Sequence, residues 1–201
     1  MIRLATVGTG WIVGEFLKGV REAGGICYTA CYSRDQQRGE AFAEEWGAQK
    51  VYTDLAQMAA DEEIDAVYIA SPNRLHYEQS KLFLQHGKHV ICEKPITVEP
   101  EELQELQELA QQKNLIYIEA LIGVYLPQMK VLQGAVERLG PVHLARFDFS
   151  QYSSKYPAYL RGELPNIFNP QMATGGWMDL GIYCLYPAIM LFGVPDHVHA
   201  H

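Results

Sequence analysis

The sequence contains no run of lysine and arginine, and its 201 residues carry a formal net charge of −8. A nucleic-acid backbone is bound by a concentrated basic surface, so we expect no nucleic-acid partner. There is also no stretch of 18 apolar residues, and residues 1–7 have the pattern of a short strand instead of a targeting leader. We therefore expect a cytoplasmic protein with no membrane partner.

Cysteine is scarce, since the sequence has four and none of them form a C-x-x-C spacing. Three lie in apolar strand-like runs, so we expect buried, reduced thiols instead of disulfides or zinc ligands. Near the end of the chain, His197, His199 and His201 alternate as they would on one face of a strand. Three imidazoles are a possible metal site, but we interpret them as exposed strand residues and predict no metal.

The composition is that of a globular protein, with 48% apolar and 20% charged residues, enough for one domain or one domain plus part of a second. Six short apolar runs alternate with helical patterns over the first 120 residues. This order predicts an α/β fold in which a doubly wound parallel Rossmann sheet forms the N-terminal domain.

A glycine-rich turn follows the first predicted strand, which spans residues 2–7. Gly8 allows a tight turn, and Gly10 lets the backbone approach a pyrophosphate that the next helix stabilises by its N-terminus. Val13 stands where a third glycine is usual, so a purely structural turn is the alternative interpretation. The candidate cofactor-binding residues of this turn are Gly8, Thr9, Gly10, Trp11 and Ile12.

The second predicted strand, residues 26–32, ends at Ser33 and Arg34. An acidic residue at such a tip is typical of NAD binding, whereas serine and arginine are typical of binding the 2′-phosphate of NADP. Asp35 lies one place beyond the tip, and Arg38 follows one helical turn after Arg34. We predict NADP as the cofactor, with NAD as the alternative; an ordinary helix cap with solvated arginines has the same spacing.

Two further strand tips carry polar groups where ligands bind in open α/β sheets. Ser71, Asn73 and His76 follow the fourth strand, and the run at residues 90–92 ends at Glu93 and Lys94, just before Pro95. The simpler interpretations are a helix cap with a surface histidine, and an ordinary charged strand end.

Beyond residue 121 the pattern changes. A helix after Pro127 precedes residues 142–149, which alternate like a half-buried strand. A later helix carries Asp179 and Tyr183, whose spacing of four places both on one face. We predict two domains, 1–121 and 122–201, the second being an incomplete α+β domain with a mostly antiparallel sheet.

These motifs together resemble the Gfo/Idh/MocA oxidoreductases. The resemblance extends over the whole chain and rests on the glycine turn, the Ser33–Arg34 tip, residues 71–76, 93–95, 119–120 and 175–183. The tyrosine at position 183 resembles the pattern of the branch that contains glucose-fructose oxidoreductase and dihydrodiol dehydrogenase. Members of the family continue beyond the end of this chain, so the resemblance implies that it is truncated in the second domain.

The resemblance implies that Gly8, Gly10, Ser33, Arg34, Asn73, Glu93 and Lys94 contact the cofactor. Lys94, Asp179 and Tyr183 would flank a sugar-like substrate, and the full-length protein would be a homo-oligomer. Three departures from the family pattern are Val13, Val124 in place of a frequent arginine, and Ala173–Thr174 in the later glycine run.

For hydride transfer, a base must take the proton of a hydroxyl group. Tyrosine titrates near about 10, so Tyr183 requires a neighbouring cation to act at neutral pH, and Lys94 is the candidate. We therefore expect an NADP-preferring dehydrogenase or reductase of a sugar or related cyclic polyol. The alternatives are a nucleotide-binding protein without turnover and a methyltransferase, of which the second leaves Glu93, Lys94 and Tyr183 unexplained.

Overall fold

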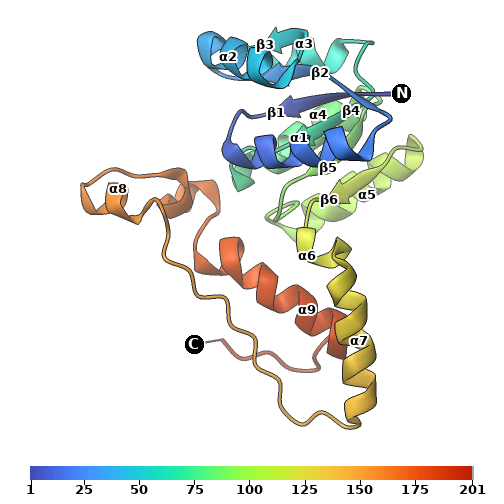
Figure 1. Cartoon of the computed structure of the whole chain (residues 1–201), viewed down its shortest axis with the longest axis vertical. Coiled ribbons are helices and arrows are strands. Elements are labelled where there is room, and N and C mark those ends of the chain that lie inside the picture. Colours follow the sequence, from blue (N-terminus) through green and yellow to red (C-terminus); the bar gives the residue numbers. More distant parts are fainter. Residues whose placement is uncertain (201) are drawn as a thin grey trace. The chain divides into compact units, whose positions relative to one another are not determined.

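The computed structural model describes residues 1–200, which fall into two compact units (Figure 1). The first unit spans Met1–Ala120 and the second begins at Leu121. Over the part of the chain that is described, no helix is both long enough and apolar enough to cross a membrane.

A six-stranded parallel sheet forms the centre of the first unit, as the sequence predicted. Its strand order is β3-β2-β1-β4-β5-β6, and every neighbouring pair is parallel. The strands are β1 (Ile2–Val7), β2 (Ile26–Tyr32), β3 (Lys50–Tyr52), β4 (Ala66–Ile69), β5 (His89–Cys92) and β6 (Tyr117–Glu119). The chain order reverses between β1 and β4, which is where doubly wound sheets open a crevice for ligands.

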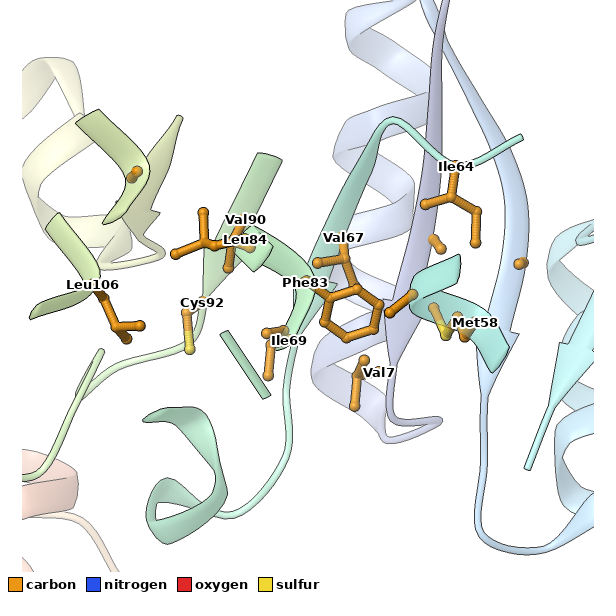
Figure 2. Packing of buried hydrophobic residues seen from close by; sticks show 14 residues of the cluster. Val7, Met58, Ile64, Val67, Ile69, Phe83, Leu84, Val90, Cys92 and Leu106 are labelled. Carbon is orange, nitrogen blue, oxygen red and sulfur yellow. The ribbon is translucent and has the colours of Figure 1, made fainter. Parts of the chain in front are cut away.

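Helices connect these strands, and the sheet buries side chains on both faces. The helices are α1 (Trp11–Ala23), α2 (Gln36–Trp46), α3 (Leu55–Ala60), α4 (His76–Gln85) and α5 (Pro100–Gln112), with a 3₁₀ turn at Asn73–Leu75 before α4. Because side chains alternate along a strand, Val67 and Ile69 join one hydrophobic cluster while Ala66 and Tyr68 join the other. Figure 2 shows the first cluster, in which Phe83 and Met58 pack beside Val67.

Local capping signals fix where several of these helices begin. The carboxylate of Asp35 accepts a hydrogen bond from the Arg38 N–H, and that of Asp54 accepts from two amides of α3. Glu99 and Glu102 form a capping box around the start of α5. The four cysteines are free thiols, with Cys31 and Cys92 buried in the sheet.

The second unit is helical over its described residues. It contains α6 (Ile122–Tyr125), α7 (Pro127–Leu139), α8 (Tyr156–Leu160) and α9 (Ile182–Phe192). Two 3₁₀ turns, Asn166–Phe168 and Pro170–Met172, and a π-helical turn, Trp177–Gly181, precede α9.

The predicted strand at residues 142–149 is wrong, as is the antiparallel sheet expected to contain it. These residues have no regular secondary structure, and neither do residues 197–200. An alternating pattern becomes a strand only when a neighbour completes its hydrogen bonds, and residues 121–200 form no strand that could do so. The expected set of three histidines includes His201, which lies outside the described residues; residues 1–200 contain no cluster of three side chains able to hold a metal ion.

Candidate functional site

The glycine turn between β1 and α1 has the backbone that its sequence predicted. Gly8 has a φ of +111°, and a Cβ atom there would lie 2.9 Å from the Ala70 carbonyl oxygen, so no other residue fits. Gly10 is the N-cap of α1, and a Cβ at this position would meet nothing within 4 Å. The first turn of α1 has no acidic residue and no side-chain cap, so its positive dipole end is not compensated by the chain. This turn suits an anion that approaches the backbone closely.

Gly14, which the prediction did not single out, brings two helices together. A Cβ on Gly14 would lie 2.9 Å from Trp46 Cζ2, so the absence of a side chain lets α1 approach the end of α2. Val13 is fully buried in the core beneath the turn. The close helix packing that a third glycine usually provides is therefore made one residue later.

At the tip of β2 the arginines are exposed, and the acidic residue caps the following helix. Ser33 is buried and its Oγ accepts a hydrogen bond from the Asp35 N–H at 3.2 Å, while Arg34 is exposed. Asp35 Oδ1 accepts from the Arg38 N–H at 2.9 Å, which confirms the helix cap. Arg38 Nη2 also donates to the Thr9 carbonyl at 3.3 Å, so this arginine links the β2 tip to the glycine turn.

At the tip of β4, the side chains of Ser71 and His76 both turn inward. Ser71 Oγ donates to Gln79 Oε1 at 2.7 Å. His76 is completely buried, so its interpretation as a surface histidine is wrong. Its Nδ1 lies 2.7 Å from the Pro95 carbonyl oxygen and its Nε2 lies 2.9 Å from that of Ser71. Burial of the ring lowers the pKa of His76.

The tip of β5 holds Glu93 and Lys94 beside this histidine in the fold. Glu93 Oε1 accepts a hydrogen bond from the Tyr68 hydroxyl at 2.5 Å, and the Tyr68 ring stacks on Phe16 of α1 at 3.8 Å. Tyr68 was not predicted as a site residue, although a tyrosine in an otherwise aliphatic buried strand signals a hydrogen-bonding role. The contact fixes the carboxylate of Glu93 above the sheet.

Several groups hold the segment after Lys94, among them the Tyr117 hydroxyl, which donates to the Ile96 carbonyl at 3.4 Å. The Lys94–Pro95 peptide bond is cis. The Ile96 N–H donates to Glu119 Oε1 at 2.8 Å, and His76 contacts the Pro95 carbonyl. Burial of Glu119 raises the pKa of its carboxyl group, and the Ile96 hydrogen bond opposes that rise.

The second unit positions Asp179 and Tyr183 within one helical segment. Asp179 lies in the π-helical turn and Tyr183 in the first turn of α9, so the segment is not the regular α-helix that the sequence predicted. The ring of Tyr183 stacks on Phe149, with centroids 5.1 Å apart and planes 21° from parallel. Both candidate residues are half-buried.

Residues 2–121 match the family described as an oxidoreductase family with an NAD-binding Rossmann fold. The chain belongs to the Gfo/Idh/MocA family. The candidate residues of the first unit lie at the carboxyl ends of β1, β2, β4 and β5, the edge at which doubly wound sheets bind nucleotides.

Several relatives of the chain are named for their activities. The chain is 42% identical over 201 residues to scyllo-inositol 2-dehydrogenase (NADP(+)) of Bacillus subtilis, matching 100% of this chain and 61% of that protein. It is 30% identical over 175 residues to mouse trans-1,2-dihydrobenzene-1,2-diol dehydrogenase, covering 85% of this chain and 50% of the relative. The chain thus spans less than two thirds of the length of these proteins.

A solved structure with the same fold is KijD10, a 3-ketoreductase from Actinomadura kijaniata crystallised with NADP and TDP-benzene. The match covers 96% of this chain and 57% of the KijD10 chain, with a TM-score of 0.80 and 24% sequence identity. At this level of identity the likeness establishes the fold of the Gfo/Idh/MocA chain.

Proposed function

We propose that this chain is the nucleotide-binding part of an NADP-preferring dehydrogenase or reductase that acts on a hydroxyl or carbonyl group of a sugar or cyclic polyol. The observation that carries the proposal is the gathering of the glycine turn, the Arg34 tip and the Glu93–Lys94 pair at one edge of the parallel sheet. Membership of an NAD-binding oxidoreductase family and the activities for which the relatives are named support it.

The residues present fit a dinucleotide phosphate. Gly10 leaves open space above the backbone, and the start of α1 offers an uncompensated positive end to a pyrophosphate. Asp35 Oδ1 accepts the hydrogen bond that caps α2, so this carboxylate oxygen is turned towards the start of the helix. Arg34 is the exposed cation that would pair with the 2′-phosphate of NADP.

A bound nicotinamide cofactor supplies the hydride acceptor or donor. In the proposed reaction, the ammonium of Lys94 stabilises the phenolate form of Tyr183, and this phenolate takes the proton from the substrate hydroxyl. Asp179 would orient the substrate or the lysine. Tyr68 and Glu93 would shape the floor of the cofactor site through their hydrogen bond.

Cofactor titration followed by fluorescence tests the proposal. NADPH should bind more tightly than NADH, and Arg34→Ala should weaken NADPH binding about tenfold while leaving NADH binding unchanged. Arg138→Ala, an exposed arginine of α7, is the matched control. Equal affinities for both cofactors, or an unchanged preference in Arg34→Ala, would contradict the NADP assignment.

Turnover with a panel of sugars and inositols tests the second half of the proposal. Oxidation of a cyclic polyol with NADP is the expected result. Cofactor binding without turnover on any member of the panel would favour a nucleotide-binding protein instead.

A further inference from the structure

His76 is a buried imidazole placed between two backbone carbonyl groups. The ring is completely inaccessible to solvent, with Nδ1 2.7 Å from the Pro95 oxygen and Nε2 2.9 Å from the Ser71 oxygen. Both distances are those of hydrogen bonds. The ring therefore joins the segment after β5 to the segment after β4.

The chemistry of these two contacts constrains the protonation of the ring. A carbonyl oxygen can only accept a hydrogen bond, and a neutral imidazole has one N–H and one lone pair. If His76 is neutral, one ring nitrogen directs its lone pair at a carbonyl oxygen, which is repulsive. The imidazolium ion has two N–H groups and satisfies both carbonyls.

The groups joined by His76 are those that carry the proposed site. Ser71 precedes Asn73, and Pro95 directly follows Lys94. The next amide, that of Ile96, is already fixed by Glu119 at 2.8 Å. If the Pro95 carbonyl were released, the segment after Lys94 would lose its contact with His76 and would keep the one between Ile96 and Glu119.

The surroundings of the ring shift the pKa of His76 in opposite directions. Burial, the largest, lowers the pKa of His76; the two carbonyl contacts and Glu93 oppose the lowering, whereas Lys94 adds to it. Other ionisable groups on the elements around this end of the sheet include Tyr68 on β4, Arg74 in the 3₁₀ turn, Tyr77 and Glu78 in the first turn of α4, Cys92 on β5, Tyr117 and Glu119 on β6, and Glu105 of α5, which accepts a hydrogen bond from Tyr77. Because burial dominates, the second proton is expected to bind at a lower pH than it does in a free histidine.

We propose that His76 is a positioning residue which joins the Ser71 turn to the Pro95 peptide, and that it makes both contacts only when its imidazole carries two protons. The protonated ring holds the Asn73 and Lys94 segments in register for the cofactor. The neutral ring releases one of them. The consequence for cofactor binding rests on the proposed function, but the protonation itself does not.

Nitrogen NMR of the histidine rings in the whole chain tests the protonation directly. The signal of His76, assigned by its loss in His76→Gln, should convert to the doubly protonated form between about pH 8 and pH 5. The NMR titration reports the protonation of His76 whether or not the protein binds a nicotinamide cofactor. A ring that stays singly protonated throughout this range would overturn the proposal.

Affinity for NADH, which lacks the titrating 2′-phosphate, tests the link to the site. Wild type should bind NADH about tenfold more tightly at pH 5 than at pH 8, since one hydrogen bond to a charged group is gained. His76→Gln should lose this dependence, because its amide donates to a carbonyl but does not titrate. His86→Gln is the matched control, since His86 lies just after the same helix with its Nδ1 against the Leu82 carbonyl.

An unchanged pH dependence in His76→Gln would refute the positioning role. If His76→Gln fails to fold, His76→Asn replaces it, and the NMR titration of wild type still decides the protonation. A wild type that binds no nicotinamide cofactor at any pH would defeat the proposed function while leaving the NMR result to stand.

Discussion

The Tyr68 hydroxyl is the single polar group of β4 that reaches from the core to the cofactor edge of the sheet. It donates to Glu93 at 2.5 Å while its ring stacks on Phe16. Tyr68→Phe removes the hydrogen bond and keeps the stacking. We expect NADPH affinity to fall about tenfold, because the carboxylate of Glu93 loses its orienting donor.

Isothermal titration of NADPH measures this loss. Tyr77→Phe is the control, since it removes another tyrosine–glutamate hydrogen bond, to Glu105, on the exposed side of the same unit. Equal affinities for Tyr68→Phe and Tyr77→Phe would mean that Glu93 is held in place by other contacts.

Lys94 and Tyr183 are proposed to serve one proton-transfer step. Lys94→Met and Tyr183→Phe should each lower kcat by about 100 to 10,000-fold, and the double variant should lose little more. Tyr183→Phe should leave NADPH binding nearly intact. Steady-state kinetics with the active polyol measures both effects, with Tyr186→Phe in the next turn of α9 as the control. A Tyr183→Phe protein with a near-normal rate would assign the base elsewhere.

Residue-level chemistry was predictable where it depends on local sequence and was not where it depends on partners distant in the chain. Gly8 and Gly10 are recognisable because a turn between a strand and a helix requires them there. The bridge made by His76 was not predictable, because both of its carbonyl partners are set by how the loops after β4 and β5 fold. Gly14 likewise has a meaning only once Trp46 is placed against it.

At the scale of elements, the edge opposite the candidate site contains an ionic network centred on Asp61 at the end of α3. Asp61 Oδ2 accepts from Lys50 Nζ and from the Tyr52 hydroxyl, both at 2.7 Å, and its backbone oxygen accepts from Lys88 Nζ. Burial alone would raise the pKa of Asp61, but the bonds from Lys50 and Tyr52 lower it to about 2. The network ties α3 to β3 and to the start of β5.

The stability that Asp61 contributes should therefore depend on pH. Its pKa in the folded protein is below that of the unfolded chain, so the contribution is complete above about pH 4 and is lost as the pH falls towards about 2. Asp61→Asn should cost about 2 kcal/mol at neutral pH, because it removes the charge of the less exposed of the two carboxylates that pair with Lys50, and only the exposed Glu63 remains. Urea unfolding at neutral and acidic pH measures this loss of stability. Glu62→Gln, which changes an exposed neighbouring carboxylate, is the control. If the difference in unfolding free energy between wild type and Asp61→Asn does not become smaller in acid, the prediction is contradicted.

The elements of the first unit were predictable because each strand is a short apolar run and several helices begin at a recognisable cap, as Asp35 and Asp54 illustrate. Residues 142–149 misled the prediction because alternation describes which faces of a strand would be buried, not whether a neighbouring strand exists. The π-helical turn at Trp177–Gly181 has no composition that distinguishes it from an α-helix; there, Gly181 lies so close to Trp177 that a Cβ would come within 2.6 Å of the indole.

At the scale of the whole molecule, the second unit lacks a core of its own over residues 121–200, where only Leu121 is buried. Large apolar side chains of α7 are exposed, with Val131 at 71% and Leu139 at 74% of their accessible surface. Exposed apolar surface of this kind drives association. We expect the protein to self-associate through this unit.

Light scattering coupled to size exclusion measures the association. Val131→Glu with Leu132→Glu should reduce the apparent mass, whereas Lys130→Glu, an exposed neighbour on α7, should not. A monodisperse monomer that melts cooperatively would show that this apolar surface is stable in water by itself.

The placement of the tryptophans divides the intrinsic light emission of the protein into distinct reporters. Trp11, 78% exposed, directly follows the glycine turn, whereas the Trp46 ring packs against the side of α1, between Gly14 and the Arg21 guanidinium, 4.6 Å from its ring. A reduced nicotinamide absorbs where indole emits, and energy transfer weakens steeply with distance. Of these two tryptophans, Trp11 should lose more fluorescence when the cofactor binds, so Trp11→Phe should reduce the quenching on binding while Trp46 continues to report on the packing between α1 and α2.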